Sequence, residues 1–358
     1  MNPIAPKCNV WASSNVADDL ASLLDAKDPK QVFLLMDEGS ERHCRTLLSP
    51  VHSLLAENSI VIPSGDDAKD YRSALAIWDF LSSHGATRKA VLVNLGGGMP
   101  CDLGGFCAST FKRGIEFINI PTTLLSQVDA SLGGKTGMNL GSLKNEIGVF
   151  QMASHVLICS DFLRSLDMDN LLSGFAEMIK HALIHAPEAV DRLLDFDFKN
   201  VDYALLHDYV AESIQIKNFF VEADPQEKGL RKALNFGHTF GHAFETFAMR
   251  SGNPVLHGFA VGWGMVCELL LCESKMGLDS NVVCHVCEKV SRLYGPHDVR
   301  GSEDALIELM THDKKNDGSG INFTLLPSVG NVAINQIASE AEIRDVFARF
   351  ADLQNHLF

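Results

Sequence analysis

Short apolar runs alternate with helical patterns through the first half of the chain. The runs are five or six residues long, and they lie at Gln31–Met36, Ser59–Pro63, Ala90–Leu95, Ile115–Ile120 and His155–Cys159. Strands that are apolar almost without interruption, and that are separated by helices, are typical of a parallel sheet buried on both faces. The pattern therefore predicts an α/β domain of the dinucleotide-binding type over residues 1–160.

The pattern changes after residue 160. From residue 161 to 358 the apolar positions follow a mostly helical period, interrupted by one hairpin-like segment at Ile321–Ile334. The sequence contains no internal repeat and no low-complexity linker. We therefore expect a mostly helical second domain that abuts the first and encloses a cleft with it.

Composition narrows the class of protein. Of 358 residues, 46% are hydrophobic and 21% are charged, which is ordinary for a globular protein of two domains. The longest apolar run, Val261–Cys272, is shorter than the ~20 residues of a membrane span and carries Glu268. The N-terminus lacks the basic start and apolar run of a secretory signal. We expect a cytoplasmic protein that does not bind membranes.

Charge and cysteine content argue against two further classes, nucleic-acid-binding proteins and proteins stabilised by a disulfide framework. A formal net charge of −15 with no compensating basic stripe disfavours nucleic-acid binding, because a phosphate backbone would be repelled. Nine cysteines scattered along a long chain indicate free thiols in a reducing compartment and no disulfide framework.

A pair of histidines four residues apart gives the first chemical signal. His238 and His242 fall on one face of a predicted helix, about one turn apart, and His257 follows between Leu256 and Gly258. The spacing is typical of a metal site. A metallopeptidase is disfavoured, because the residues between the two histidines include no glutamate general base.

A carboxylate on an upstream helical turn completes a candidate metal set. Glu177 with His238 and His257 makes a two-histidine, one-carboxylate group, which catalytic zinc favours and which leaves a coordination position open for substrate. His181 and His242 lie on the same helical faces and remain rival ligands.

A glycine-rich loop follows the third predicted strand. The segment Gly96–Gly98, which runs on to Asp102, would let the backbone approach a pyrophosphate, and the start of the next helix favours an anion. The loop lacks the full dinucleotide-binding fingerprint, because Cys101 occupies the place of the third glycine.

Taken together, five motifs resemble the 3-dehydroquinate synthases, the sugar phosphate cyclases of the shikimate pathway. The motifs are Gly96–Asp102, Pro121–Asp129 running into Lys135, Lys144–Asn145, Gly229–Arg231 and Leu234–His242. The resemblance covers nearly the whole chain. It implies a Rossmann-like, parallel-sheet NAD-binding domain followed by a mostly helical metal-binding domain, with NAD and Zn²⁺ as cofactors and Co²⁺ as a substitute metal.

The resemblance also implies which residues bind the cofactors. Glu177, His238 and His257 correspond to the zinc ligands. The positions that correspond to NAD contacts are Asp37, Asp66, Lys69, Gly97, Gly98, Met99, Asp102, Thr122, Thr123, Asp129, Lys135, Lys144, Phe162 and Ser165. Two of these depart from the family pattern, since Asp66 replaces a glutamate and Met99 replaces a valine.

A further set of mostly cationic residues corresponds to positions that contact the substrate. The set consists of Lys135, Asn145, Lys180, Lys217, Arg231, Asn235, His242 and Lys315, with Arg113 reaching the phosphate across the interface of an expected homodimer. Gathering these cations in an acidic protein is costly unless a polyanion is bound. Arg231 offers a planar fork for a carboxylate, with Lys217 as a second cation.

The reaction implied is the conversion of 3-deoxy-D-arabino-heptulosonate 7-phosphate to 3-dehydroquinate and phosphate. NAD transiently oxidises the substrate, phosphate is eliminated with the substrate's own phosphate accepting the proton, NADH returns the hydride, and the opened ring closes by an intramolecular aldol step. The protein's part is to position the substrate, to stabilise the charge that develops during the reaction and to exclude water.

Three rival functions remain. A sibling cyclase acting on sedoheptulose 7-phosphate would not need Arg231 and Lys217, because that substrate has no carboxylate. An NAD- and metal-dependent polyol dehydrogenase of the glycerol dehydrogenase kind acts on neutral substrates and would not need these cations together with Lys135. A non-catalytic regulatory or scaffolding descendant would be expected to lose metal ligands first, and all three are present.

Overall fold

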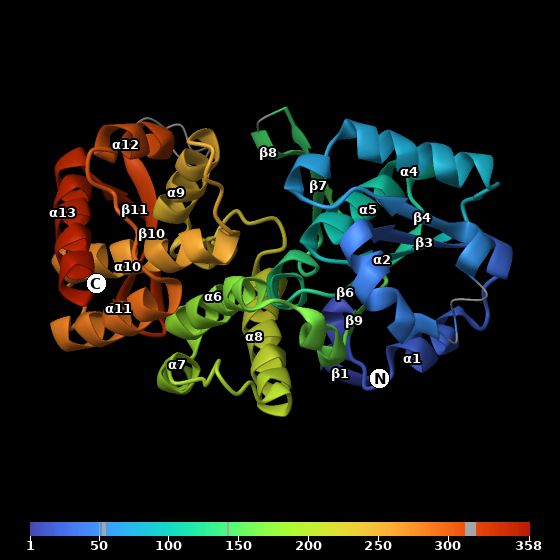
Figure 1. Ribbon diagram of the computed structural model, residues 1–358, viewed down its shortest axis with the longest axis horizontal. Coiled ribbons are helices and arrows are strands. Elements are labelled where there is room, and N and C mark those ends of the chain that lie inside the picture. The colour runs from blue at the N-terminus through green and yellow to red at the C-terminus, as the bar shows by residue number, and fades with distance from the viewer. Residues whose placement is uncertain (50, 52–54, 142, 312–319) are drawn as a thin grey trace. The chain divides into compact units, whose positions relative to one another are not determined.

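The computed structural model describes residues 1–49, 51, 55–141, 143–311 and 320–358. These residues form two compact units, and each is described by itself (Figure 1). The first unit comprises Met1–Asp167 and Asp202–Asn218, and the second comprises Met168–Val201 and Phe219–Phe358.

The first unit thus includes two segments that the sequence assigned to the second domain, 161–167 and 202–218. The reason is a set of side-chain contacts from helix α8 (Tyr203–Ala223), whose residues through Asn218 belong to this unit. Ser160 Oγ lies 2.5 Å from His207 Nδ1, and the Arg164 guanidinium lies 4.7 Å from the centre of the Tyr203 ring. Helical periodicity alone does not show with which domain a helix packs.

A seven-stranded sheet forms the centre of the first unit. Its strands, in spatial order, are β1 (Asn2–Ala5), β2 (Val10–Ala12), β9 (His155–Ile158), β6 (Glu116–Pro121), β5 (Val91–Gly96), β3 (Val32–Asp37) and β4 (Ser59–Ile62). All neighbours pair in parallel except β1, which is antiparallel to β2. The five predicted strands are confirmed, and the sequence missed only the two short strands at the edge of this sheet.

One face of the sheet packs against the helix that follows β2. Leu34, Val93 and Ile118 point to this face and form a buried cluster with Val16 and Leu20 of α1 (Val16–Leu24). The cluster also receives side chains from α2 (Glu38–Cys44). Alternate residues of each strand supply this face, as the two-residue period of a strand requires.

The opposite face packs against α4 (Tyr71–Ser83) and α5 (Gly98–Thr110). The Phe33 ring lies 6.1 Å from the Phe80 ring of α4. Gly104 of α5 approaches the sheet so closely that a Cβ there would lie 2.1 Å from Asn94 Oδ1 and 2.7 Å from a methyl group of Leu35. The sheet is therefore covered on both faces, which confirms the predicted class of parallel sheet.

The order of the strands creates a topological switch point. From β3 the chain proceeds to β4 on one side, and it then returns to form β5 on the other side of β3. In parallel sheets of this kind, ligands bind beyond the carboxyl ends of the two strands that flank the reversal. Asp37 ends β3 and Gly96 ends β5, so both residues lie at this edge.

A second, separate hairpin belongs to the same unit. Strands β7 (Lys135–Leu140) and β8 (Leu143–Phe150) pair antiparallel, and Gly137 lies opposite Gly148. A Cβ at Gly148 would lie 2.4 Å from the carbonyl oxygen of Thr136, so the close approach of the two strands requires glycine. The sequence did not predict this hairpin, because β8 is mostly exposed and has no buried apolar face.

The second unit is mostly helical, as predicted. Its elements are α6 (Met168–His185), α7 (Pro187–Leu194), the last residues of α8, α9 (His238–Arg250), α10 (His257–Met276), α11 (Ser280–Tyr294), α12 (Glu303–Thr311), β10 (Ile321–Ser328), β11 (Asn331–Ala338) and α13 (Glu340–Leu357). Helix α10 contacts α6, α9, α11, α13 and β10. Figure 1 shows α9 and α11 on opposite sides of it.

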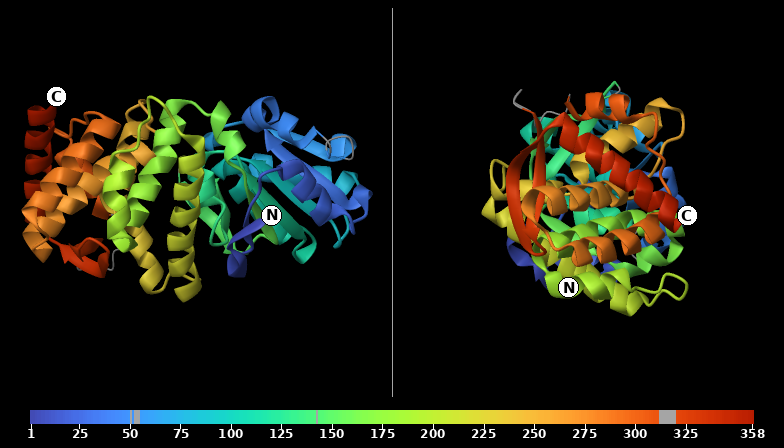
Figure 2. Two further views of the ribbon diagram at one scale, coloured as in Figure 1. Left: turned by 90° about the horizontal axis from the view of Figure 1, so that it is seen from below. Right: turned by 90° about the vertical axis from the view of Figure 1, so that its left-hand side faces the viewer.

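Helix α10 is the core of this unit, and nearly all of its residues from Gly258 to Cys272 are buried. The predicted hairpin is confirmed as β10 and β11, which pair antiparallel and lie at the edge of the helices (Figure 2). Among the described residues, no helix is both long enough and apolar enough to cross a membrane.

Candidate metal and dinucleotide sites

Close packing of α6 against α10 brings two candidate metal ligands together. Gly258 follows His257 directly, and Ser173 precedes Glu177 by one helical turn. The Gly258 N–H donates to Ser173 Oγ at 3.0 Å, and a Cβ at Gly258 would lie 1.9 Å from the carbonyl oxygen of Ser173. Only glycine allows this approach, which places the start of α10 beside the middle of α6.

A similar contact fixes the third ligand, at the start of α9. A Cβ at Gly264 of α10 would lie 2.0 Å from the carbonyl oxygen of Gly237, the residue before His238. The buried carboxylate of Glu268 accepts hydrogen bonds from the backbone N–H groups of Gly237, at 2.7 Å, and Thr239, at 3.1 Å. These two bonds flank His238 and satisfy donors at the start of the helix, where a negative charge is favourable.

The three predicted ligands lie together in the second unit. His238 Nε2 lies 3.5 Å from Glu177 Oε1, and His257 Nε2 lies 3.6 Å from the same oxygen. One ligand atom from each of the three residues lies within 4.8 Å of the other two, a spacing that can hold a metal ion.

The chemistry of this group fits a divalent metal. Glu177 is fully buried, and its Oε1 has no hydrogen-bond partner among the described residues. A buried carboxylate oxygen without a partner is costly unless a cation is bound to it. The other oxygen, Oε2, pairs with the buried Lys180. The unpartnered Glu177 Oε1 and the two imidazole nitrogens that face it, one from His238 and one from His257, form a donor set suited to zinc.

Electrostatics keep two of these groups in the state that a metal needs. Burial raises the pKa of Glu177, but the charge of Lys180 and the neighbouring His257 imidazole outweigh this effect and hold that pKa well below its usual range. Burial and the charge of Lys180 hold the pKa of His238 well below its usual range, so its imidazole is neutral.

His257 differs from His238. Burial would lower the pKa of His257, but the carboxylate of Glu177, 3.6 Å away, and that of Glu245, which accepts a hydrogen bond from the ring, raise it to about 10 in the metal-free site. A metal bound at this imidazole would therefore compete with a proton.

The two rival ligands are placed differently. The His242 ring centre lies 5.2 Å from that of His238 and 6.1 Å from that of His257, so His242 borders the group. His181 lies one turn beyond Glu177 on α6 and is fully buried.

In the first unit, the glycine-rich loop lies at the switch point. Gly97 precedes the first turn of α5, which begins with Gly98 and Met99. A Cβ at Gly97 would lie 3.2 Å from Thr123 Cγ2, so the loop and the segment after β6 are in close contact. The Thr122 N–H donates to the Gly96 carbonyl at 2.9 Å and ties the two segments together.

The acidic residues predicted for the adenosine end of a dinucleotide already have partners. Asp37 caps α2 by accepting from the Ser40 N–H at 2.8 Å, and its Oδ2 accepts from Ser64 Oγ at 3.1 Å. Asp66 is exposed and forms an ion pair with Lys144 at 3.0 Å.

Three predicted residues form one cluster around a buried lysine. Lys69 is 4% exposed, donates to Asp102 Oδ2 at 2.6 Å and also donates to Asn145 Oδ1. Burial raises the pKa of Asp102, and the charge of Lys69 opposes this shift. The structure thus joins two residues predicted to bind NAD with one predicted to bind the substrate.

A second ion pair lies in the same unit. Lys217 of α8 donates to the backbone oxygen of Asp129 at 2.6 Å and to its carboxylate at 2.5 Å. Asp129 lies in a π-helical turn, Ser126–Ala130. The charges of Asp129 and Lys217 both act on Asp102, so the two ion pairs form one electrostatic group.

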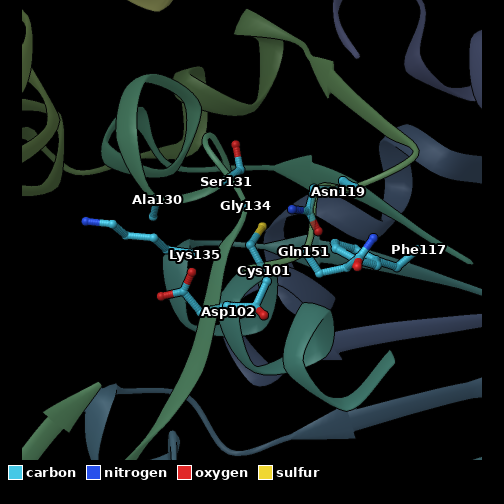
Figure 3. A pocket seen from close by; sticks show the side chains of 11 residues that line it. Cys101, Asp102, Phe117, Asn119, Ala130, Ser131, Gly134, Lys135 and Gln151 are labelled. Atoms are coloured by element: carbon cyan, nitrogen blue, oxygen red, sulfur yellow. The ribbon is translucent and has the colours of Figure 1, made fainter. Parts of the chain in front are cut away.

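A small cavity lies beside α5, and Figure 3 shows the side chains around it. Cys101, Asn119 and Ser131 line it, and the buried Ser131 Oγ has no hydrogen-bond partner among the described residues. Lys135 belongs to the lining, but its amino end points away from the other labelled side chains (Figure 3).

The remaining predicted residues are spread over both units. Phe162 is 1% exposed and packs in the core of the first unit, while Ser165 Oγ donates to the Phe162 carbonyl. Arg113 is exposed and has a left-handed backbone conformation. In the second unit, Asn235 donates to Glu227 Oε1 at 3.0 Å. Lys315 lies outside the described residues.

Arg231, also in the second unit, is 1% exposed. Its Nη1 donates to the Pro225 carbonyl at 2.8 Å, and its backbone N–H donates to Asp224. A buried guanidinium offers several N–H donors in a planar fork, which suits an anion.

Sequence reasoning missed several residues that hold the candidate metal ligands in place. His238, His242 and Glu245 lie at positions i, i+4 and i+7 of one helix and therefore share a face. This spacing could have identified Glu245. Glu268 interrupts an apolar run, which is itself a sign of a buried role. Ser173 carried no signal, because its role depends on a contact between two helices.

Comparisons with known proteins agree with this geometry. Residues 59–173 match the family described as 3-dehydroquinate synthase N-terminal, and residues 174–316 match 3-dehydroquinate synthase C-terminal. A 3-dehydroquinate synthase from Parabacteroides distasonis is 45% identical over 330 residues, which cover 92% of this chain and 94% of that protein.

Two solved structures share the fold. A 2-epi-5-epi-valiolone synthase from Streptomyces hygroscopicus, with NAD⁺ and Zn²⁺ bound, has a TM-score of 0.80 at 23% identity and covers 96% of each chain. A 2-deoxy-scyllo-inosose synthase, in complex with carbaglucose-6-phosphate, NAD⁺ and Co²⁺, has a TM-score of 0.82 at 21% identity, covering 95% of this chain and 96% of that one. They confirm the predicted fold class. The family matches in both halves, together with the 45% identity, show that the chain belongs to the 3-dehydroquinate synthase family.

Proposed function

We propose that this protein is a 3-dehydroquinate synthase that converts 3-deoxy-D-arabino-heptulosonate 7-phosphate to 3-dehydroquinate and phosphate. The observation that carries the proposal is the 45% identity to a 3-dehydroquinate synthase over 92% of this chain. The sibling cyclases with the same fold are 21% and 23% identical, and at that level they support the fold alone.

Glu177, His238 and His257 would hold zinc, with cobalt as a substitute, and would leave a coordination position open for substrate. Bound zinc would supply a Lewis acid that polarises substrate hydroxyls. Lys180 pairs with Glu177 Oε2 and thereby turns the unpartnered Oε1 toward the two imidazoles. The pair also offsets the negative charge of a buried carboxylate.

NAD would bind at the switch point of the sheet, with its pyrophosphate at the start of α5. Bound NAD would supply reversible acceptance of a hydride. Gly97 and Gly98 remove side chains from the approach to the helix start, whose free N–H groups favour an anion. Asp102 is held in place by Lys69, so its carboxylate has a fixed position beside the loop.

The substrate carries a carboxylate and a phosphate, and each would be bound by cations. We assign Arg231 to the carboxylate, because its guanidinium is buried and is held at Nη1 by the Pro225 carbonyl. Loss of a buried charged partner costs on the order of 2–5 kcal/mol, which is roughly 30- to several-thousand-fold in binding.

A comparison of two substrates tests the proposal. We expect phosphate release from the heptulosonate phosphate, dependent on zinc and NAD, and much slower release from sedoheptulose 7-phosphate, which lacks the carboxylate. Arg231→Ala should reduce the preference for the heptulosonate phosphate over sedoheptulose 7-phosphate, because it should weaken binding of the carboxylate-bearing substrate only. Faster turnover of sedoheptulose 7-phosphate by the wild-type protein would assign the chain to a sibling reaction.

We further propose a cytoplasmic homodimer. The cytoplasmic location is supported by the free cysteines of the described chain. The dimer is supported by the exposed Arg113, which corresponds to a residue that reaches the phosphate of the neighbouring active site.

A further inference from the structure

We propose that Glu245 is a positioning residue for the metal site, which holds His257 through Nδ1 and so presents Nε2 to the metal. The inference rests on the metal site proposed above. Glu245 is not among the site residues predicted from the sequence, although it lies on the same helix, α9, as His238 and His242.

The hydrogen bond sets the tautomer of His257. His257 Nδ1 lies 3.2 Å from Glu245 Oε2. Because a carboxylate can only accept, Nδ1 must carry the proton in this contact. The lone pair for metal binding is then on Nε2, the atom that lies 3.6 Å from Glu177 Oε1.

The two histidine ligands are oriented by different acceptors. His238 Nδ1 lies 3.0 Å from the Phe236 carbonyl, a neutral acceptor. His257 Nδ1 meets a carboxylate, which raises the basicity of the ring as a carbonyl does not. His257 should therefore be the stronger donor of the pair, and its strength should depend on the charge of Glu245.

The surroundings favour this role for Glu245. Its side chain is 14% exposed, and that of His257 is 25% exposed, so the bond is largely shielded from water. Glu245 lies on α9 and His257 begins α10, so the bond also links the two helices that supply the histidine ligands.

Zinc affinity of the full-length protein provides the test, measured by competition with a chelator. Glu245→Ala removes the acceptor, Glu245→Gln keeps the shape and removes the charge, and Glu245→Asp restores the charge on a shorter side chain. Glu308→Gln, on the exposed face of α12, is the matched control for the loss of one negative charge.

We expect Glu245→Ala to bind zinc about 10- to 100-fold more weakly, the range found for partners of metal-bound histidines. Glu245→Gln should lie between this variant and the wild type, and Glu245→Asp should recover part of the loss. In the cobalt-loaded protein, the visible absorption bands should shift in Glu245→Ala and Glu245→Gln and stay unchanged in Glu308→Gln.

Two outcomes would overturn the inference while leaving the metal site intact. One is zinc affinity within about twofold of wild type in both Glu245→Ala and Glu245→Gln, with unchanged cobalt spectra, far below the effect expected for such a partner. The other is an equal loss of affinity in Glu308→Gln, which would assign the effect to net charge. Failure of the wild type to bind zinc would overturn the metal site and this inference together.

Discussion

Gly258→Ala should damage both the stability and the metal site of the second unit. A Cβ at this position would lie 1.9 Å from the carbonyl oxygen of Ser173 and 2.4 Å from its Cα. Both are backbone atoms of α6, so no side-chain rotation can relieve the collision. An ordinary contact begins at 3.4 Å, so the backbone of α6 or α10 must shift by up to about 1.5 Å to relieve the contact with the carbonyl oxygen.

The energetic cost follows from two contributions. Overpacking a close-packed site costs about 1–3 kcal/mol. The hydrogen bond from the Gly258 N–H to Ser173 Oγ would also break, at a cost of about 1 kcal/mol. We expect the free energy of unfolding to fall by about 2–4 kcal/mol. Because metal–ligand distances tolerate about 0.2 Å, separating Glu177 from His257 should also weaken zinc binding at least about tenfold.

Denaturant unfolding and chelator competition measure the two effects. Ser173→Ala is the matched control, because it removes the hydrogen bond without the collision. It should lose about 1 kcal/mol of stability and bind zinc nearly as well as the wild type. The reasoning would be refuted if Gly258→Ala unfolded within about 0.5 kcal/mol of wild type, the usual spread for neutral substitutions, and kept its zinc affinity.

Three further predictions concern the site. Glu177→Gln and His257→Ala should each lower zinc affinity by more than about 100-fold, since each removes a ligand, and metal analysis of folded variants checks this; full occupancy in both would shift the assignment to other residues. Zinc affinity should rise about tenfold per pH unit from pH 7 to 9, because the pKa of His257 is about 10 in the metal-free site and binding releases that proton; a flat profile would contradict this. Arg113→Ala should weaken substrate binding without changing the mass by light scattering, and a wild-type monomer that is fully active would refute the dimer.

The fold was largely predictable, because its strands are continuous apolar runs. A run such as Val91–Leu95 is buried on both faces. So apolar a strand is stable only inside a sheet that is covered on both sides, so the run itself indicates the class of sheet. The β7–β8 hairpin was not predictable in this way, because its strands pair through glycine contacts and leave most side chains of β8 exposed.

The grouping of the three candidate metal ligands was predictable from the sequence, and the residues that hold them in place were less so. The spacing of His238 and His242 on one helix is a local signal, Glu177 and His257 completed a two-histidine, one-carboxylate set, and the resemblance to a family favoured that set over the rival ligands His181 and His242. Ser173 and Gly258 act through a contact between residues 85 positions apart, and no local pattern encodes such a contact. The pairing of Lys69 with Asp102 likewise depends on tertiary structure.

The most direct test of the proposed function follows phosphate and reduced nicotinamide in the same reaction. The zinc-loaded protein with NAD should release one phosphate per heptulosonate phosphate consumed, because hydride leaves and returns within one turnover. Absorbance of NADH should show no steady rise. Stoichiometric NADH from a neutral polyol, without phosphate release, would contradict the account and identify a dehydrogenase.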